Sequence, residues 1–177
     1  MTDTDLRYPV GRFEPPASVS ADERRALVRA LAQAPADLRA LVEPLADSDL
    51  DRPYRPGGWT IRQVVHHLPD SHMNGYVRMK LAATENAPAI MLYEQARWAE
   101  LPEARTAPIG MSLDLLSALH RRWVAFLAGL DDAGFRRPFR HPESGLVPIE
   151  VALALYVWHG RHHTAQVRNA LAAGTRG

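Results

Sequence analysis

The pattern of hydrophobic and polar positions predicts four long amphipathic helices. The first begins at Ser20, because Ser20 and Glu23 have the spacing of a capping box. Its apolar positions recur at roughly helical intervals; they are Leu27, Leu31, Leu38, Leu41 and Leu45. Pro35 and Pro44 are expected to kink or interrupt this helix, since proline cannot donate a backbone hydrogen bond. The segment before it, residues 1–19, contains three prolines and no periodicity, which predicts an extended arm.

The second helix has a capping box of its own in Thr60 and Gln63. It is expected to run to about Leu81 or Ala83, with a kink or loosened turn at Pro69. Before it, the stretch from Asp47 to Gly58 is rich in Asp, Pro and Gly and is predicted to be a loop.

The third helix has an apolar stripe on one side. The stripe consists of Leu115, Leu116, Leu119, Trp123, Phe126, Leu127 and Leu130. The fourth helix is expected to begin near Pro148 or Ile149 and to end at Gly174, because proline suits a first turn and glycine suits the residue after a last one. Between them, residues 131–148 indicate a loop that could contain a short hairpin.

Four amphipathic stripes bury one another most simply in a four-helix bundle. The fold class predicted here is therefore all-α, in one domain that spans residues 1–177. The connection over residues 84–111, with a short helix around 93–100, is long for adjacent antiparallel helices. It is expected either to cross the bundle or to cover one end of it.

Composition limits the chemistry before any site is chosen. The chain of 177 residues has no cysteine, which excludes disulfides, thiolate metal ligands and a cysteine nucleophile. Its net charge of +1, with 21 basic and 20 acidic residues, argues against a nucleic-acid partner. The longest wholly apolar run, Val151 to Trp158, is too short to span a bilayer. The start of the chain does not resemble a secretory signal, so a cytoplasmic location is predicted.

The fourth helix carries three of the eight histidines within five residues. At about 100° per residue, His159 falls on the face that also holds Leu155 and Gln166, and His162 and His163 lie on its two flanks. Histidines four apart on a helix can bind one metal ion, so His159 and His163 form a candidate ligand pair. His159 and His162 are a second candidate pair. The alternative, histidines that are merely hydrogen-bonded in the core, is weakened by the cost of burying three polar rings together.

The second helix offers three more histidines, and periodicity does not select a ligand among them. The apolar face is centred nearest His72, His67 sits at one edge, and His66 points further away. Pro69 makes the helical phase beyond it uncertain. From the residues alone, His72 is the buried candidate, and His66 and His67 are not separated.

Two blocks of the sequence resemble the DinB/YfiT-like family, and specifically its YfiT branch. Residues 58–68 (GWTIRQVVHHL) and the following 70–74 (DSHMN) resemble the metal-site helix of that family, and residues 156–159 (YVWH) with His162 and His163 resemble its last helix. Shorter likenesses are spread along most of the chain; they include Tyr8-Pro9, Gly11, residues 53–55, Thr84-Glu85, residues 88–90, Leu119-His120, Arg122-Trp123, Phe139 and His141-Pro142.

The resemblance implies a four-helix bundle with one divalent metal ion, nickel or zinc, held by His67, His159 and His163. It also implies a homodimer in the cytoplasm. Members of the YfiT branch are described as metal-dependent hydrolases, and related members transfer low-molecular-weight thiols to electrophiles or use such thiols in isomerisations. Pro69 departs from the family pattern two residues after the proposed ligand, where it could re-aim His67.

A metal ion on three neutral imidazoles would keep open coordination positions, as in catalytic zinc sites. Three functions follow as hypotheses: a hydrolase acting on a small molecule, a thiol S-transferase, and a metal-binding stress protein without activity. Since the chain has no cysteine, any thiol must be a cosubstrate.

No general acid or base is identified from the sequence, so the catalytic residues are left unknown. Asp70 could orient a ligand or move a proton, but a solvated or helix-end Asp70 is the favoured interpretation. Gln166 could line the pocket, and a core amide is an equal alternative. Arg62 could hold an anionic substrate, although a surface position is the favoured interpretation. The two tryptophans nearest the histidines, Trp59 and Trp158, are expected to be packing residues. His120 and His141 show no connection to the site.

Overall fold

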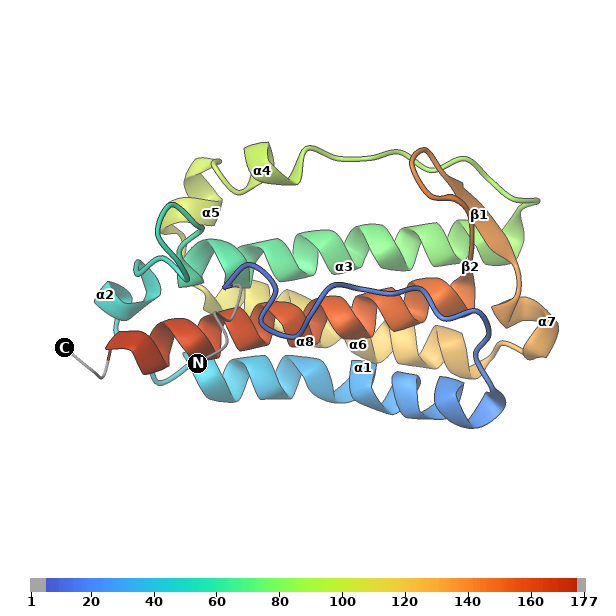
Figure 1. The fold of residues 1–177 in the computed structure, drawn as a ribbon, viewed down its shortest axis with the longest axis horizontal. Helices are drawn as coiled ribbons and strands as arrows, with labels where there is room; N and C mark the ends of the chain where they lie inside the picture. Colours follow the sequence, from blue (N-terminus) through green and yellow to red (C-terminus); the bar gives the residue numbers. More distant parts are fainter. Residues whose placement is uncertain (1–5, 175–177) are drawn as a thin grey trace.

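Four long helices pack side by side in the computed structural model, which describes residues 6–174 (Figure 1). They are α1 (Ala21–Val42), α3 (Ile61–Thr84), α6 (Gly110–Ala128) and α8 (Ile149–Gly174). Both α1 and α3 pack against α6 and α8, so α1 and α3 occupy diagonal corners of the bundle. The predicted all-α four-helix bundle is confirmed.

The connection between α3 and α6 runs along the bundle rather than over one of its ends. In Figure 1, α3 and α6 run in the same direction, and the connecting chain returns along the outer side of α3. Two short helices, α4 (Gln95–Trp98) and α5 (Pro102–Thr106), lie on this return, and both contact α3. The long connection was predicted from its length; its path follows from the parallel arrangement of α3 and α6, which a short loop cannot produce.

Both predicted capping boxes are present. The Glu23 amide donates to Ser20 Oγ and the Ser20 amide donates to the Glu23 carboxylate at 2.7 Å, and Thr60 and Gln63 make the equivalent pair. Ala21–Val42 ends before Pro44, as expected.

Neither of the other two prolines interrupts its helix, because α1 continues through Pro35 and α3 continues through Pro69. Both prolines are buried. Packing on the neighbouring helices offsets the hydrogen bond that each proline removes.

The loops contain more regular structure than the sequence indicated. The stretch predicted as a loop after α1 contains α2 (Asp47–Leu50), a single turn whose last residue is buried. The segment before α8 contains α7 (Asp132–Phe135) and the hairpin of β1 (Pro138–His141) and β2 (Gly145–Pro148), as the hairpin hypothesis allowed. β1 also binds the long connection, since the Arg140 amide donates to the carbonyl of Pro88 at 2.8 Å and its carbonyl accepts from Ile90 at 3.1 Å.

The N-terminal arm lies along α8. Of residues 1–19, the first five lie outside the described part of the chain; the rest form no helix or strand and follow α8 in Figure 1. Trp158 Nε1 donates to the Gly11 carbonyl at 3.3 Å, and Gln166 Nε2 donates to the Arg7 carbonyl at 3.2 Å. These contacts place the start of the arm beside the histidines of α8.

A layer of histidines separates two apolar clusters in the bundle. One cluster gathers around Trp123 and Leu153, and the other gathers around Ile61 and Val167. On α6, His120 lies between the positions that contribute to the two clusters, and the histidines of α8 lie between its two sets in the same way. The polar layer at mid-height is where the fold positions its chemistry. Within residues 6–174, no helix is long and apolar enough to cross a membrane.

Candidate metal centre

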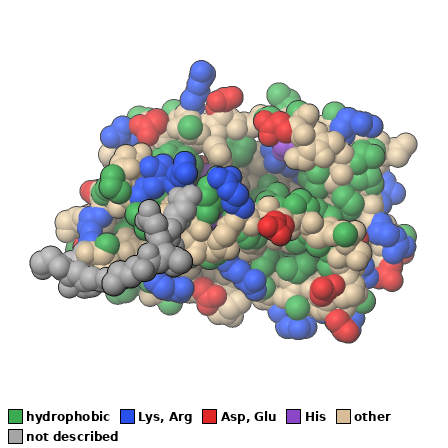
Figure 2. Space-filling model, viewed as in Figure 1, with side chains coloured by type: hydrophobic (Ala, Val, Ile, Leu, Met, Phe, Trp, Pro, Cys, Tyr) green, Lys and Arg blue, Asp and Glu red, His purple; other side chains and the backbone are tan. Residues whose placement is uncertain are grey.

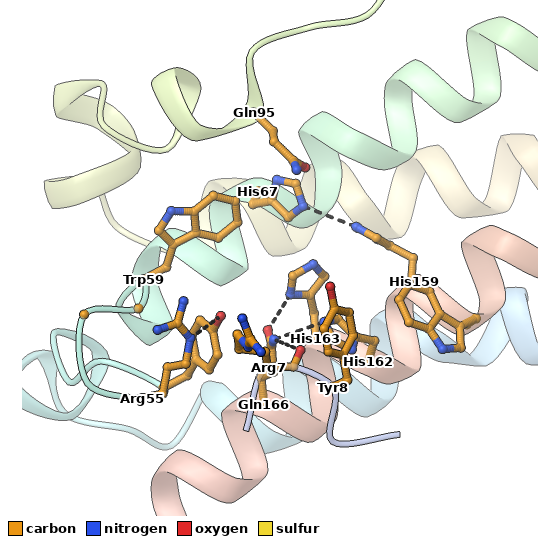
Figure 3. A pocket seen from close by; sticks show the side chains of 14 residues that line it. Arg7, Tyr8, Arg55, Trp59, His67, Gln95, His159, His162, His163 and Gln166 are labelled. Atoms are coloured by element: carbon orange, nitrogen blue, oxygen red, sulfur yellow. Dashed lines mark hydrogen bonds between the residues drawn. The ribbon is translucent and has the colours of Figure 1, made fainter. Parts of the chain in front are cut away.

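His67 from α3 and His159 and His163 from α8 converge on one point (Figure 3). One nitrogen atom from each ring lies within 4.8 Å of the others. His67 Nε2 and His159 Nε2 lie 3.2 Å apart. The structure therefore brings together the three residues that the family resemblance selected. Pro69 does not turn His67 away from the other two.

Burial keeps these imidazoles uncharged. Loss of solvent, with a smaller contribution from a neighbouring histidine, lowers the pKa of His67 to about 4. Desolvation and the other histidines also hold the pKa of His159 and of His163 well below the ordinary value. At neutral pH each ring is therefore uncharged and has one nitrogen with a free lone pair, which is the form that binds metal.

Gln166 fixes which nitrogen of His163 is free. Its amide Nε2 donates to the Arg7 carbonyl and to His162 Nε2, at 3.2 and 3.0 Å, so its Oε1 faces His163 as an acceptor. His163 Nδ1 lies 2.8 Å from that oxygen and must carry the proton. His163 Nε2 is left unprotonated. Gln166 therefore lines the cavity, one of its two interpretations from the sequence, and it also orients His163, a role that the sequence did not suggest.

The three histidines form one wall of a cavity of about 420 Å³. The indole of Trp59 lies 4.9 Å from the His67 ring and 6.5 Å from the His163 ring, so Trp59 is a wall of this cavity and not only a packing residue. The loop that carries it is closed by a bridge between Pro53 and Thr60. Within the described chain the remaining lining residues are Arg7, Tyr8, Tyr54, Arg55, Gly57, Gly58, Gln95, Trp158, His162 and Gln166.

The cavity has a positive lining. Arg7 and Arg55 both line it, and no described aspartate or glutamate does. In Figure 3 both arginine side chains lie on the side of the cavity opposite Gln95, whose amide points towards His67. Figure 2 shows basic side chains gathered on this face of the molecule, and a histidine set back in a hollow. Such a cavity favours an anionic group in a bound molecule.

A second cavity, of about 300 Å³, reaches His159 from another side. Its wall contains His159 and Gln95, which also line the first cavity, together with Ser71, Arg78 and Tyr156. His159 is thus exposed to two spaces, one of them shared with the other two histidines. His141 lines the second cavity, and its Nδ1 accepts from the amides of the hairpin turn.

The other histidines of α3 are buried but lie outside the triad. His66 faces α6, where its Nδ1 lies 2.7 Å from Ser112 Oγ and its Nε2 lies 3.1 Å from the Ala107 carbonyl. His72 is 1% exposed, as the periodicity indicated, yet it contacts His159 from behind rather than from the cavity. Burial of His72 was therefore predicted correctly, although burial does not mark the candidate ligand.

Two charged residues that the sequence offered as site candidates belong elsewhere. The expectation that Arg62 lies at the surface is wrong, because the residue is only 5% exposed. Its guanidinium pairs with Asp47 at 3.0 Å and with Asp51 at 2.8 Å, and these ion pairs tie α2 to α3. Asp70 lines neither cavity, and burial, together with the nearby Glu103, raises its pKa to about 6.

The donor set fits a divalent metal ion. Each of three neutral imidazoles turns one nitrogen towards a common point beside a cavity, and on His163 the proton lies on the nitrogen turned away. Histidine nitrogens suit zinc, nickel, copper and iron(II). An ion on these three donors would have open positions on the cavity side, as ions in catalytic zinc sites do and those in closed structural sites do not.

Comparisons with known proteins identify the family of this chain. The sequence pattern of the DinB superfamily matches residues 30–167. The chain belongs to the DinB superfamily. It is 48% identical over 168 residues to YfiT from Bacillus subtilis (strain 168), a match that covers 94% of each protein. A Bacillus mycoides (strain KBAB4) relative is 45% identical over 163 residues, which cover 92% of this chain and 94% of the relative.

A solved structure of the same superfamily matches the fold closely. It is that of YfiT from Bacillus subtilis, described as "a probable metal-dependent hydrolase with an unusual four-helix bundle topology". The TM-score is 0.94 at 46% identity, over 96% of this chain and 98% of that one. The diagonal placement of α1 and α3 is thus a feature of a DinB superfamily bundle. Both relatives carry the words "metal-dependent hydrolase" in their names, which supports metal dependence.

Several residues around the site had no signal in the sequence. Arg7, Arg55 and Gln95 come from the arm, the loop before α3 and the long connection, and no periodicity relates such segments. His120 is different, because it lies one turn from Leu116 and Trp123 on the apolar stripe of its helix. The phase of that stripe could have placed it inside the bundle.

Proposed function

We propose that this protein is a divalent-metal-dependent hydrolase that binds one zinc or nickel ion through His67, His159 and His163. The observation that carries the proposal is the convergence of three uncharged imidazoles in the wall of a cavity. When bound, such an ion lowers the pKa of a coordinated water towards about 7 and polarises a carbonyl or phosphoryl oxygen.

The surrounding residues would bind and orient the substrate. The Trp59 indole offers an apolar wall beside two of the proposed ligands. Arg7 and Arg55 would attract an anionic group, and the Gln95 amide points towards the ligands from the opposite side. We infer that the substrate is a small molecule that combines an apolar portion with a carboxylate, phosphate or sulfonate.

The test is a set of assays on zinc-loaded and nickel-loaded protein. Ester, amide and phosphoester substrates, each in a neutral and an anionic form, are incubated with and without a low-molecular-weight thiol. Hydrolysis that requires the metal, needs no thiol and is lost in His163→Ala supports the proposal. Tight metal binding with no turnover of any substrate would contradict it and would favour a metal-binding protein without activity.

Thiol S-transfer is the second candidate, and the second cavity favours it. Two cavities meet at His159, so a thiol and an electrophile could reach the site from different sides. The absence of cysteine means that the thiol would be a cosubstrate. Consumption of an electrophile that requires both metal and thiol, with no hydrolysis in the thiol's absence, would favour transfer over hydrolysis.

Replacing Arg55 with glutamine is expected to raise KM for an anionic substrate about 10-fold, with little change for its neutral counterpart. The Arg55 side chain is held by Tyr54 Oη and the Pro56 carbonyl, at 3.1 and 3.0 Å, which positions its charge at the cavity. A hydrogen bond to a charged group contributes about 1.5–3 kcal/mol. Since about 1.4 kcal/mol corresponds to a tenfold change, a 10-fold rise in KM is the low end of the expected effect. Equal KM changes for both substrates would show that Arg55 shapes the cavity instead of recognising charge.

We also keep the homodimer and the cytoplasmic location as proposals, which rest on the likeness to the YfiT branch. Light scattering of the purified protein tests the first, and fractionation of the source cells tests the second.

A further inference from the structure

A chain of hydrogen bonds leads from His159 through the bundle to a backbone carbonyl of α1. His159 Nδ1 lies 3.1 Å from His72 Nε2, and His72 Nδ1 lies 2.8 Å from His120 Nε2. His120 Nδ1 lies 2.6 Å from the Leu31 carbonyl oxygen. These hydrogen bonds therefore link four helices in turn: α8, α3, α6 and α1.

The last member of the chain sets the direction of every bond in it. A carbonyl oxygen only accepts, so His120 Nδ1 must donate to Leu31 and carry the proton. In a neutral ring His120 Nε2 is then an acceptor, and His72 Nδ1 must donate to it. By the same step His72 Nε2 accepts, and His159 Nδ1 donates. His159 Nε2, the atom that faces His67, is left with its lone pair.

Pro35 explains why the Leu31 carbonyl is available. In an α-helix the carbonyl of residue 31 accepts from the amide of residue 35, and proline has no amide hydrogen. Leu31 is fully buried, so its carbonyl would otherwise lack a hydrogen-bond partner in the core. His120 supplies the missing donor. The proline within α1, which does not break the helix, thereby creates the anchor of the chain.

The two inner histidines of this hydrogen-bond chain are shielded from solvent and uncharged. His72 and His120 are each 1% exposed, and their ring planes are only 12° apart with centroids at 4.9 Å, as a hydrogen bond in the ring plane requires. Within residues 6–174 neither ring hydrogen-bonds to a carboxylate that could offset the cost of a buried charge. Each ring therefore carries a single proton, which is the condition that makes the direction of the chain unambiguous.

We propose that His72, His120 and the Leu31 carbonyl form a positioning relay that locks His159 in the tautomer with an unprotonated Nε2. The relay does not touch substrate. It acts through His159, by fixing both the proton and the orientation of its ring, as the outer partners of metal-binding histidines commonly do. Its effect on metal binding rests on the proposed site, whereas the tautomers themselves can be read in the metal-free protein.

The direct test is a two-bond ¹H–¹⁵N correlation spectrum of the metal-free wild-type protein with assigned histidine rings. The relay predicts that His72, His120 and His159 all carry the proton on Nδ1. A proton on Nε2 of His159, or a mixture of its tautomers, would overturn the proposal. This result does not depend on whether the protein hydrolyses anything, so it is separate from the test of the proposed function.

The second test compares His120→Met with His120→Gln. The two side chains have similar length, but the glutamine amide can turn its NH₂ to Leu31 and its oxygen to His72, whereas methionine offers no comparable acceptor. His120→Met is expected to lower zinc affinity about 10–100-fold, the range usual for loss of an outer hydrogen-bond partner. His120→Gln is expected to stay within about threefold of the wild type on the same basis.

The matched pair separates positioning from packing. Equal losses of zinc affinity in the two variants, or no loss in either, would contradict the relay, since both change the core volume in the same way. In the tautomer spectrum, His120→Met should release the proton of His159 to both nitrogens, and His120→Gln should leave it on Nδ1. If His120→Met fails to fold, the wild-type spectrum and the glutamine variant still decide the question.

Discussion

Alanine at His163 is expected to lower zinc affinity by about 100-fold or more and to abolish metal-dependent turnover. Losing an outer hydrogen-bond partner of a ligand typically lowers metal affinity by about 10–100-fold. His163 is itself a proposed ligand, so its loss should lower zinc affinity by at least the upper end of that range. The same result is expected for His67→Ala and His159→Ala, because two remaining imidazoles bind a divalent ion only weakly. The measurement is competition with a chromogenic chelator, together with elemental analysis that should give about one ion per chain in the wild type.

His66→Ala is the matched control for this prediction. His66 is adjacent to His67 and equally buried, at 5% and 4% exposed, but its nitrogens bond to Ser112 and Ala107 rather than facing the other histidines. It should lose stability and keep full metal occupancy. Full occupancy in all three of the ligand variants would reject the site. Loss of metal in His66→Ala with none in His67→Ala would show that the ligand had been assigned to the wrong neighbour.

The helices could be predicted from the sequence because their signals are local. Capping boxes at Ser20 and Thr60 mark two starts, and the apolar spacing carries each helix to its end. Local signals do not give the spatial order of the helices. The diagonal placement of α1 and α3 depends on how the connection of residues 85–109 packs along α3, and that packing is tertiary.

The pair His159 and His163 could be found from spacing, but the third residue could not. Every residue from 61 to 69 is buried, because α3 is covered by α6, α8 and the segment around α5. A helix buried on most sides has no polar face, so periodicity gives no phase that separates His66 from His67. Only the family resemblance selected His67. The assumption that arginine lies at the surface failed at Arg62 for the same reason.

Replacing Gly75 with alanine is expected to destabilise the protein by about 1–2 kcal/mol, although alanine is the better helix former. A Cβ at position 75 would lie 2.3 Å from Cζ of Tyr156 and 2.4 Å from its Cε2, which no packed core tolerates. Overpacking of this kind typically costs about 1–3 kcal/mol. The gain in helix propensity, about 1 kcal/mol, offsets only part of a clash this close. Urea unfolding of the two proteins measures the difference.

The clash would also reach the metal site, because Tyr156 lies against the relay. Its ring centroid is 5.3 Å from that of His72 and 6.1 Å from that of His159, and the residue is 6% exposed. A displaced ring at this position would press on both histidines. Gly75→Ala should therefore lower zinc affinity as well as stability, whereas a purely local strain in α3 would change stability alone.

Gly160→Ala provides the control, since Gly160 also lies inside a long helix but an added Cβ would meet its nearest atoms at 3.8 Å. This variant should be neutral or more stable by up to about 1 kcal/mol, as helix propensity alone dictates. Adding Tyr156→Leu to Gly75→Ala should recover part of the loss, because the shorter side chain removes the atoms that the new Cβ would meet. If the two changes prove additive, contact with Tyr156 is not what requires glycine at position 75.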